Sequence, residues 1–397
     1  MKAVVFHGVG DIRLDEVPEP TIQEPTDAIV RLTASAICGT DLHFVRGTMP
    51  GTKEGRILGH EGVGIVEEIG EHVRNLETGD RVVVPSTIAC GTCSYCRAGY
   101  HAQCDNANPN GPGTAFFGGP EDAGGFDGLQ AEKARIPYAN VGLVKLPDEV
   151  SDDQAILISD IFPTGYQAAD LAGIRDGDVV CVFGCGPVGQ FAIWSAKHLG
   201  AGRVLAVDAV PDRLDAARRQ GAEVVDFEND DPIELIEEMT RGVGPDRVID
   251  AVGVDANRSP DADGEEFEQA IERLVPERAP QGPHWQPGSG PTQVLQWAVE
   301  VVAKAGTISL VGVYPPTVQQ FPIGEAFMKN LTITMGNCNH RKYIPHLVEL
   351  TRAGVVDPSA LVTQVEDVAG AVEAYEQFDL RRPGWLKVAL AGAATRT

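Results

Sequence analysis

The chain has 397 residues, of which 43% are hydrophobic, and its 32 basic against 57 acidic residues give a formal net charge of -25. This length predicts two or three domains with sizeable cores, and no apolar run approaches the roughly 18 residues that cross a bilayer. The charge would repel phosphate backbones and anionic lipids, which argues against nucleic acid and membranes as partners. Ordinary solubility and adaptation to a salty host both explain such acidity.

The region before about residue 160 is rich in glycine and short strand-like runs, with one short helical candidate from about Cys38 to Val45. Two turns in it carry side chains that bind metals: Cys38 with Thr40 and His43, and His60 with Glu61. Two candidate ligands do not define a metal site by themselves. For His43, an ordinary surface position is the alternative.

Four cysteines follow in a C-x2-C-x2-C-x7-C pattern. Four thiolates on one loop are what a closed tetrahedral zinc site requires, so a structural-zinc lobe is expected at about residues 88–106. Disulfides are the alternative, but the start Met-Lys-Ala-Val-Val-Phe shows no apolar secretory segment, which favours a cytoplasmic protein. A closed four-thiolate site does no chemistry. The predicted ligands are Cys90, Cys93, Cys96 and Cys104.

From about residue 178 to 313, short β-branched runs alternate with helix-length amphipathic segments, which predicts a doubly wound parallel sheet. The expected strands are 179–183, 204–207, 247–249 and 307–311, and the expected helices are 190–199, 211–220, 232–240 and 292–305.

The first of these strands runs into Gly184-Cys185-Gly186-Pro187-Val188-Gly189, and a helix follows. Strand, glycine turn and helix in this order place a pyrophosphate on the helix N-terminus. Asp208 closes the next strand, where its carboxylate would accept hydrogen bonds from the adenosine ribose and repel a 2′-phosphate, so NAD is favoured over NADP. A purely structural turn would leave Asp208 unexplained. Arg213 would lie over the adenosine or be simply solvated.

The segment 255–291 interrupts the sheet. Its first part predicts an amphipathic helix, because apolar residues recur at helical spacing from Phe267 to Val275. Its second part, 276–291, is rich in proline and glycine and reads as a loop. Further strands follow, with one good helix at 344–353.

Together these features resemble the zinc-dependent medium-chain alcohol dehydrogenases. The resemblance rests on the Cys-Gly-Thr-Asp turn at Cys38, the Gly-His-Glu motif at His60 with its following glycines, the cysteine lobe and the order of the nucleotide-binding fold. It implies an α/β protein with a GroES-like, β-rich catalytic domain (1–160 and 314–397) and a Rossmann NAD-binding domain (161–313, insertion 255–291). It also implies a homotetramer.

The resemblance implies a catalytic zinc held by Cys38, His60 and a third residue just ahead of Thr164-Gly165-Tyr166, which here is Asp160. Most of the family has cysteine there, and the aspartate resembles the formaldehyde dehydrogenase-like branch. Cysteine, aspartate and neutral histidine carry the same ligand charge as two cysteines and a histidine. A surface or helix-cap position is the alternative for Asp160. Glu61 is expected beside the zinc.

The function implied is hydride transfer between an alcohol, or an aldehyde hydrate, and NAD, with two zinc ions per subunit. Thr40 would pass the alcohol proton through the cofactor ribose to His43, and Lys387 would lie near the cofactor pyrophosphate. In related proteins the insertion can cover the cofactor; a helix on a neighbouring subunit, or a solvated excursion, is the equal alternative.

Two further functions are weighed. A polyol or secondary-alcohol dehydrogenase would share these motifs, because the sequence does not fix the loops that line a substrate pocket. A non-catalytic scaffold built on the cysteine module is disfavoured by the acidic charge and the NAD motif.

Overall fold

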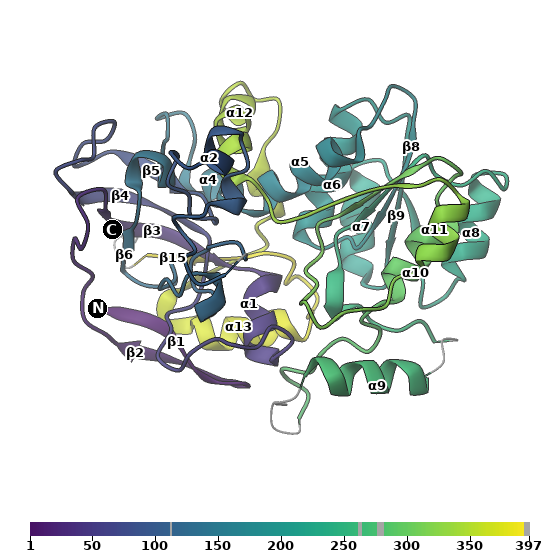
Figure 1. Ribbon diagram of the computed structural model, residues 1–397, viewed down its shortest axis with the longest axis horizontal. Coiled ribbons are helices and arrows are strands. Elements are labelled where there is room, and N and C mark those ends of the chain that lie inside the picture. Colours follow the sequence, from purple (N-terminus) through teal and green to yellow (C-terminus); the bar gives the residue numbers. More distant parts are fainter. Residues whose placement is uncertain (112, 261–263, 276–281, 393–397) are drawn as a thin grey trace. The chain divides into compact units, whose positions relative to one another are not determined.

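The structure is a computed structural model that describes residues 1–111, 113–260, 264–275 and 282–392 (Figure 1). It divides into two compact units. Unit 1 comprises Met1–Pro163, Glu277–Gln286 and Cys338–Thr397, and unit 2 comprises Thr164–Pro276 and Pro287–Asn337. The boundary expected at residue 314 lies inside unit 2, because one more strand after it joins the parallel sheet.

Unit 2 contains a six-stranded parallel sheet in the order β10-β9-β8-β11-β12-β13, which confirms the predicted α/β class. The order reverses between β8 and β11, and the glycine turn leaves the carboxyl end of β8 at this switch point, where doubly wound sheets bind ligands. The strands are β8 Val179–Phe183, β9 Arg203–Asp208, β10 Glu223–Asp226, β11 Arg247–Asp250, β12 Thr307–Leu310 and β13 Thr332–Met335.

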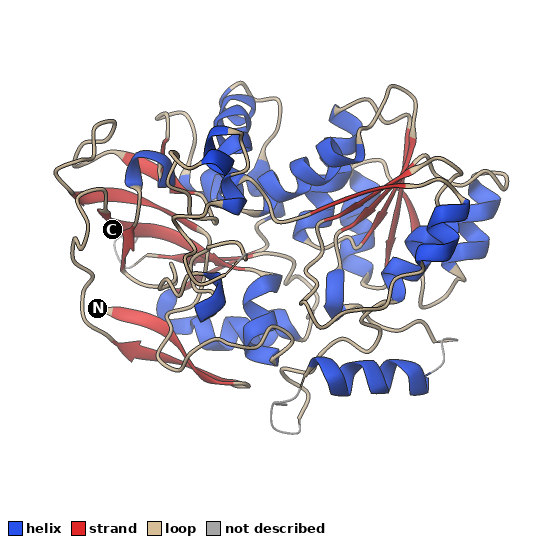
Figure 2. Cartoon of the chain, viewed as in Figure 1, coloured by secondary structure: helices blue, strands red, loops and turns tan. Residues whose placement is uncertain are grey.

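Helices cover both faces of this sheet (Figure 2). One hydrophobic cluster joins the strands to α5, α6 and α7, and another joins them to α8, α10 and α11. Strands buried on both faces explain the near-continuous β-branched runs of the sequence. The helices are α5 Ile161–Ala172, α6 Pro187–His198, α7 Pro211–Arg219, α8 Pro232–Met239, α10 Gln293–Val301 and α11 Ile323–Met328.

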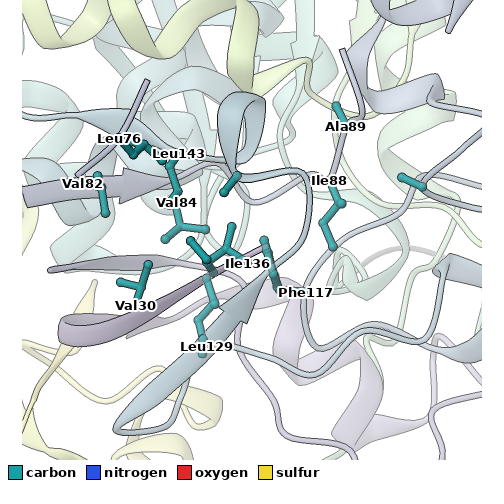
Figure 3. Close-up of a cluster of buried hydrophobic side chains, with 14 of the residues drawn as sticks. Val30, Leu76, Val82, Val84, Ile88, Ala89, Phe117, Leu129, Ile136 and Leu143 are labelled. Carbon is teal, nitrogen blue, oxygen red and sulfur yellow. The ribbon is translucent and has the colours of Figure 1, made fainter. Parts of the chain in front are cut away.

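Unit 1 is built on a seven-stranded sheet with the path β14-β15-β3-β4-β5-β7, in which β6 pairs with β3; β1 and β2 form a separate antiparallel pair. Figure 3 shows part of the core that covers the sheet, including Val30, Val84 and Ile136. The strands are β1 Lys2–Gly8, β2 Asp11–Glu16, β3 Ala28–Ile37, β4 Gly62–Ile69, β5 Arg81–Val84, β6 Lys133–Ile136, β7 Val144–Lys145, β14 Gln364–Asp367 and β15 Val388–Ala391.

The helices of unit 1 are more numerous than the sequence analysis predicts. Neither α4 nor α13 is predicted, and α12 begins at His340, four residues before the predicted start. The helices are α1 Gly39–Arg46, α2 Ser94–Arg97, α3 Ala139–Gly142, α4 Asp152–Ser159, α12 His340–Arg352 and α13 Ala371–Asp379. No helix in the described part of the chain is both long and apolar enough to cross a membrane.

The inserted segment contains the predicted helix, α9 Gly264–Leu274. Leu274 and Val275 pack against Val254 and Tyr314 in unit 2. Residues 261–263 and 276–281 of the insertion, and the predicted apolar contribution of the Phe267 side chain, lie outside the described residues. Trp285, in contrast, packs into a core cluster of unit 1.

Candidate zinc and cofactor sites

The structure brings Cys38, His60, Glu61 and Asp160 together inside unit 1. Cys38 follows β3 and caps α1, His60 and Glu61 precede the neighbouring strand β4, and Asp160 caps the C-terminal end of α4. One ligand atom from each residue lies within 4.8 Å of the others, and all four residues are buried. The surface alternative for Asp160 is therefore wrong: its exposed fraction is 8%.

The two carboxylate oxygens of Asp160 face different partners. Oδ2 lies 3.3 Å from His60 Nε2 and 3.6 Å from Cys38 Sγ, whereas Oδ1 lies 2.6 Å from His340 Nε2. Burial alone would raise the pKa of Asp160, but hydrogen bonds to His340 and His60 outweigh it and hold that pKa well below its usual range. The sequence analysis did not find His340, and no local spacing connects it to Asp160.

Asp41 fixes the orientation of His60. Its Oδ1 lies 3.0 Å from His60 Nδ1, and its Oδ2 accepts hydrogen bonds from Cys38 N at 2.9 Å and Gln130 Nε2 at 3.3 Å. With Nδ1 engaged, Nε2 is the ring nitrogen that faces Asp160. Carboxylates behind ligand histidines commonly fix the ring in this way. Asp41 belongs to the Cys-Gly-Thr-Asp turn, so the motif contained the signal.

Glu61 forms an ion pair with Lys387, the residue directly before β15. Lys387 Nζ lies 2.5 Å from Glu61 Oε2 and 3.0 Å from Ile37 O, and the lysine is fully buried. Lys387 Nζ thus has two partners within unit 1, and its expected place near the cofactor pyrophosphate stays a prediction. Glu61 Oε1 is buried and has no hydrogen-bond partner among the described atoms.

The donor set fits zinc. A thiol, an imidazole nitrogen and a carboxylate oxygen are the ligand types of catalytic zinc sites, and the buried Glu61 Oε1 without a partner is explained if a cation lies near it. Without a metal, burial raises the pKa of the Cys38 thiol. A bound cation would instead favour the thiolate.

Thr40 and His43 both lie on α1, two and five residues after Cys38. Thr40 is half-buried, and His43 is buried with its Nδ1 3.0 Å from Thr48 Oγ1. The surface alternative for His43 is therefore wrong, since its exposed fraction is 5%.

The second candidate metal site is the cysteine lobe of unit 1. Its four sulfur atoms lie within 4.8 Å of one another, and backbone N–H groups point at them: Thr92 N and Cys93 N each lie 3.3 Å from Cys90 Sγ. Burial opposes ionisation of Cys90, but a hydrogen bond with the Thr92 hydroxyl, together with these backbone hydrogen bonds, outweighs it and lowers the pKa of Cys90 to about 6. All eight cysteines of the chain are free thiols in the structure.

In unit 2 the glycine turn and Asp208 meet at the carboxyl end of the sheet. Asp208 Oδ2 accepts a hydrogen bond from Cys185 N at 2.7 Å, and its Oδ1 accepts from Ala209 N and Val210 N. Arg213 Nη1 lies 3.8 Å from Asp208 Oδ2, and the Arg213 guanidinium is the nearest group to the open face of Gly186.

Gln190 ties this turn to α7, a role that sequence reasoning missed. It is fully buried, and its Nε2 donates to Cys185 O at 2.8 Å and Arg213 O at 2.9 Å. A polar residue directly after the last glycine was the only sequence signal.

Residues 24–148 match the family model described as alcohol dehydrogenase GroES-like domain, and residues 187–261 match the one described as zinc-binding dehydrogenase. An uncharacterized zinc-type alcohol dehydrogenase-like protein of Bacillus subtilis is 38% identical over 98% of this chain and 100% of its own length. A glutathione-independent formaldehyde dehydrogenase of Pseudomonas aeruginosa is 40% identical over 64% of this chain and 66% of its own.

Among solved structures, the alcohol dehydrogenase TADH from Thermus sp. ATN1 is 35% identical, with a TM-score of 0.81 over 98% of this chain and 99% of the other. Fold, sites and matches together define a zinc-dependent oxidoreductase. The chain belongs to the zinc-type alcohol dehydrogenase family, and its cofactors are zinc and a nicotinamide dinucleotide.

Proposed function

We propose that this protein transfers a hydride between a small alcohol, or the hydrate of an aldehyde, and NAD, with formaldehyde-type substrates as its preferred class. The observation that carries the proposal is the buried cluster of Cys38, His60 and Asp160 beside a Glu61 oxygen without a partner. In this proposal Cys38, His60 and Asp160 hold the catalytic zinc. Cys90, Cys93, Cys96 and Cys104 hold a structural one.

Zinc bound at the first cluster would acidify a substrate hydroxyl, and the nicotinamide would accept the hydride. Residues around that site orient its ligands and balance its charge. Asp41 fixes the His60 ring, and Lys387 balances the charge of Glu61, which would otherwise add an unpaired negative charge beside the ligands. Thr40 and His43 are proposed to carry the alcohol proton away, and the hydrogen bond with Thr48 holds the His43 ring.

The preference for NAD is supported by the place of Asp208 at the carboxyl end of β9, next to the glycine turn. A carboxylate there repels the 2′-phosphate of NADP. Three backbone N–H groups hold the carboxylate in place. The positive charge of Arg213 offsets part of the negative charge of Asp208, so we expect a preference for NAD rather than an absolute requirement.

Formaldehyde-type substrates are supported by the aspartate at position 160 and by the partial match to a glutathione-independent formaldehyde dehydrogenase. We also propose that the protein is cytoplasmic, which suits eight free thiols, and that it forms a homotetramer, as the family resemblance implies.

The test is reduction of NAD and of NADP by the purified protein with formaldehyde, with and without glutathione, and with primary, secondary and polyhydric alcohols. Zinc is counted in the same samples. The Asp160→Asn variant should lose one zinc and the activity, whereas Asp153→Asn, the same change at an exposed position of α4, should lose neither. A protein with about two zinc ions per subunit that oxidises none of these substrates would overturn the proposal.

A further inference from the structure

We propose that His340 is a positioning residue that makes Asp160 bind the catalytic metal through a single oxygen. The proposal rests on the role of Asp160 as a metal ligand, proposed above. The His340 contact explains how aspartate, which has two possible donor atoms, can replace cysteine, which has one, at position 160.

The geometry separates the two oxygens of Asp160. Oδ2 faces the other two ligands, at 3.3 Å from His60 Nε2 and 3.6 Å from Cys38 Sγ. Oδ1 faces His340 Nε2 at 2.6 Å, on the other side of the carboxylate. An ionised carboxylate can only accept hydrogen bonds, so His340 Nε2 carries the hydrogen and donates it.

His340 is itself held in place. It is 3% exposed, stands first in α12, and its Nδ1 lies 3.1 Å from Thr87 Oγ1. The residue before it, Asn339, accepts a hydrogen bond from Ala102 N of the cysteine lobe at 3.0 Å. The imidazole therefore presents Nε2 to Asp160 from a fixed support.

The chemical consequence concerns the number of metal bonds. A thiolate offers one donor atom, whereas a carboxylate offers two and can bind a metal through both. Bidentate binding by Asp160 would fill a coordination position that a catalytic zinc keeps for its substrate. The His340 hydrogen bond holds Oδ1 away from the ligand cluster, so Asp160 replaces a single-donor ligand and the position stays open.

The test uses His340→Leu, which removes the donor, and His340→Gln, whose amide keeps one. His346→Leu, an exposed histidine on the same helix, is the matched control. Cobalt replaces zinc in each protein, because its visible absorption is stronger when it is four-coordinate than when it is five-coordinate. The cysteine lobe is the same in every variant, so differences between spectra come from the other site.

We expect wild type, His340→Gln and His346→Leu to share the strong absorption. His340→Leu should lose part of this absorption, because the cysteine lobe still contributes its own share, and it should release catalytic zinc to a chelator about tenfold faster and lose about tenfold or more in kcat/KM. An unchanged spectrum and release rate in His340→Leu would overturn the proposal.

The Asp160→Cys background makes the test specific, because a thiolate has no second donor to restrain. There, adding His340→Leu should change neither the spectrum nor zinc release. His340→Leu could misfold in the wild-type background and yet fold together with Asp160→Cys; that result would support the proposed action of His340 on Asp160. Misfolding in both backgrounds would show a merely structural role and overturn the proposal. If Asp160→Asn keeps the wild-type spectrum and metal content, the ligand assignment itself is what fails.

Discussion

Glu61 and Lys387 form an ion pair from which water is excluded: Nζ and Oε2 are 2.5 Å apart, and neither side chain is exposed. The two residues lie 326 positions apart in the chain: Glu61 directly precedes β4, and Lys387 directly precedes β15. Burial raises the pKa of the Glu61 carboxyl, and Lys387 opposes that rise. The pair therefore links the segment that enters the last strand of unit 1 to the candidate zinc site.

Replacing Lys387 with methionine should strongly destabilise unit 1. The change leaves the Glu61 charge buried without a partner, which costs roughly 3–5 kcal/mol. Urea unfolding measures the loss, and Lys53→Met, at an exposed lysine, is the control. The double variant Glu61→Gln with Lys387→Met should recover most of the loss. A single variant within about 1 kcal/mol of wild type would show that the pair is not buried as described.

Cys104→Ser should remove one zinc per subunit and lower the thermal midpoint. Cys104 Sγ lies 4.0 Å from Cys93 Sγ and accepts a hydrogen bond from Cys90 N, so its loss opens a closed four-thiolate site. Cys90, Cys96 and Cys104 also pack in a main core cluster of unit 1, which explains why the loss should reach beyond the lobe. Metal analysis and calorimetry are the measurements. Cys181→Ala, at a cysteine of β8, should keep both zinc ions; unchanged zinc in Cys104→Ser would contradict the site.

The features that could be predicted are those whose residues lie close together in the sequence. The glycine turn, its strand and its helix follow each other directly, and the four cysteines fall within fifteen residues. The parallel sheet was predicted as well, because strands buried on both faces are continuously apolar. Helix α13 was overlooked, although its buried residues recur at helical spacing from Ala371 to Phe378.

The cluster of Cys38, His60, Glu61 and Asp160 could not be derived from spacing. Cys38 and Asp160 lie 122 residues apart, and only the family resemblance connected them. The partners behind the ligands were harder still, since a histidine 180 residues after Asp160 carries no local sign of its contact. The ion pair between Lys387 and Glu61 was not predicted either, because the two residues lie far apart in the sequence.

Two glycines of the cofactor turn should respond differently to alanine. A Cβ at Gly189 would lie 1.8 Å from Gly184 O, a clash with backbone, whereas a Cβ at Gly186 would meet its nearest neighbour, the Arg213 guanidinium, at an ordinary 3.8 Å. Gly189→Ala should therefore lower the stability of unit 2 by a few kcal/mol. Gly186→Ala should fold normally and lose NAD affinity, because its open face is where a pyrophosphate would approach.

Thermal unfolding and NAD titration of both variants separate the two effects. Equal losses of stability would show that the turn is packed on both sides. Wild-type NAD affinity in Gly186→Ala would show that the cofactor does not approach this glycine.

Asp250→Asn should make the protein more stable at neutral pH. Asp250 ends β11, is fully buried, and accepts hydrogen bonds from Tyr314 Oη at 2.7 Å and from Val252 N and Gly253 N. Burial raises its pKa above the usual 3.8 despite these bonds. Because the native state then binds the proton more tightly than the unfolded state, stability falls as pH rises from about 4 to the native pKa. The total fall is about 1.4 kcal/mol for each unit by which the native pKa exceeds the unfolded one.

Asparagine at position 250 keeps the hydrogen bonds: its oxygen accepts from the two backbone groups and its amide donates to Tyr314 Oη. Urea unfolding from about pH 4 upward should show Asp250→Asn gaining on wild type until the difference levels off above the native pKa of Asp250, while Asp230→Asn, an exposed control, stays parallel to wild type. A constant difference over this range would contradict a raised native pKa of Asp250.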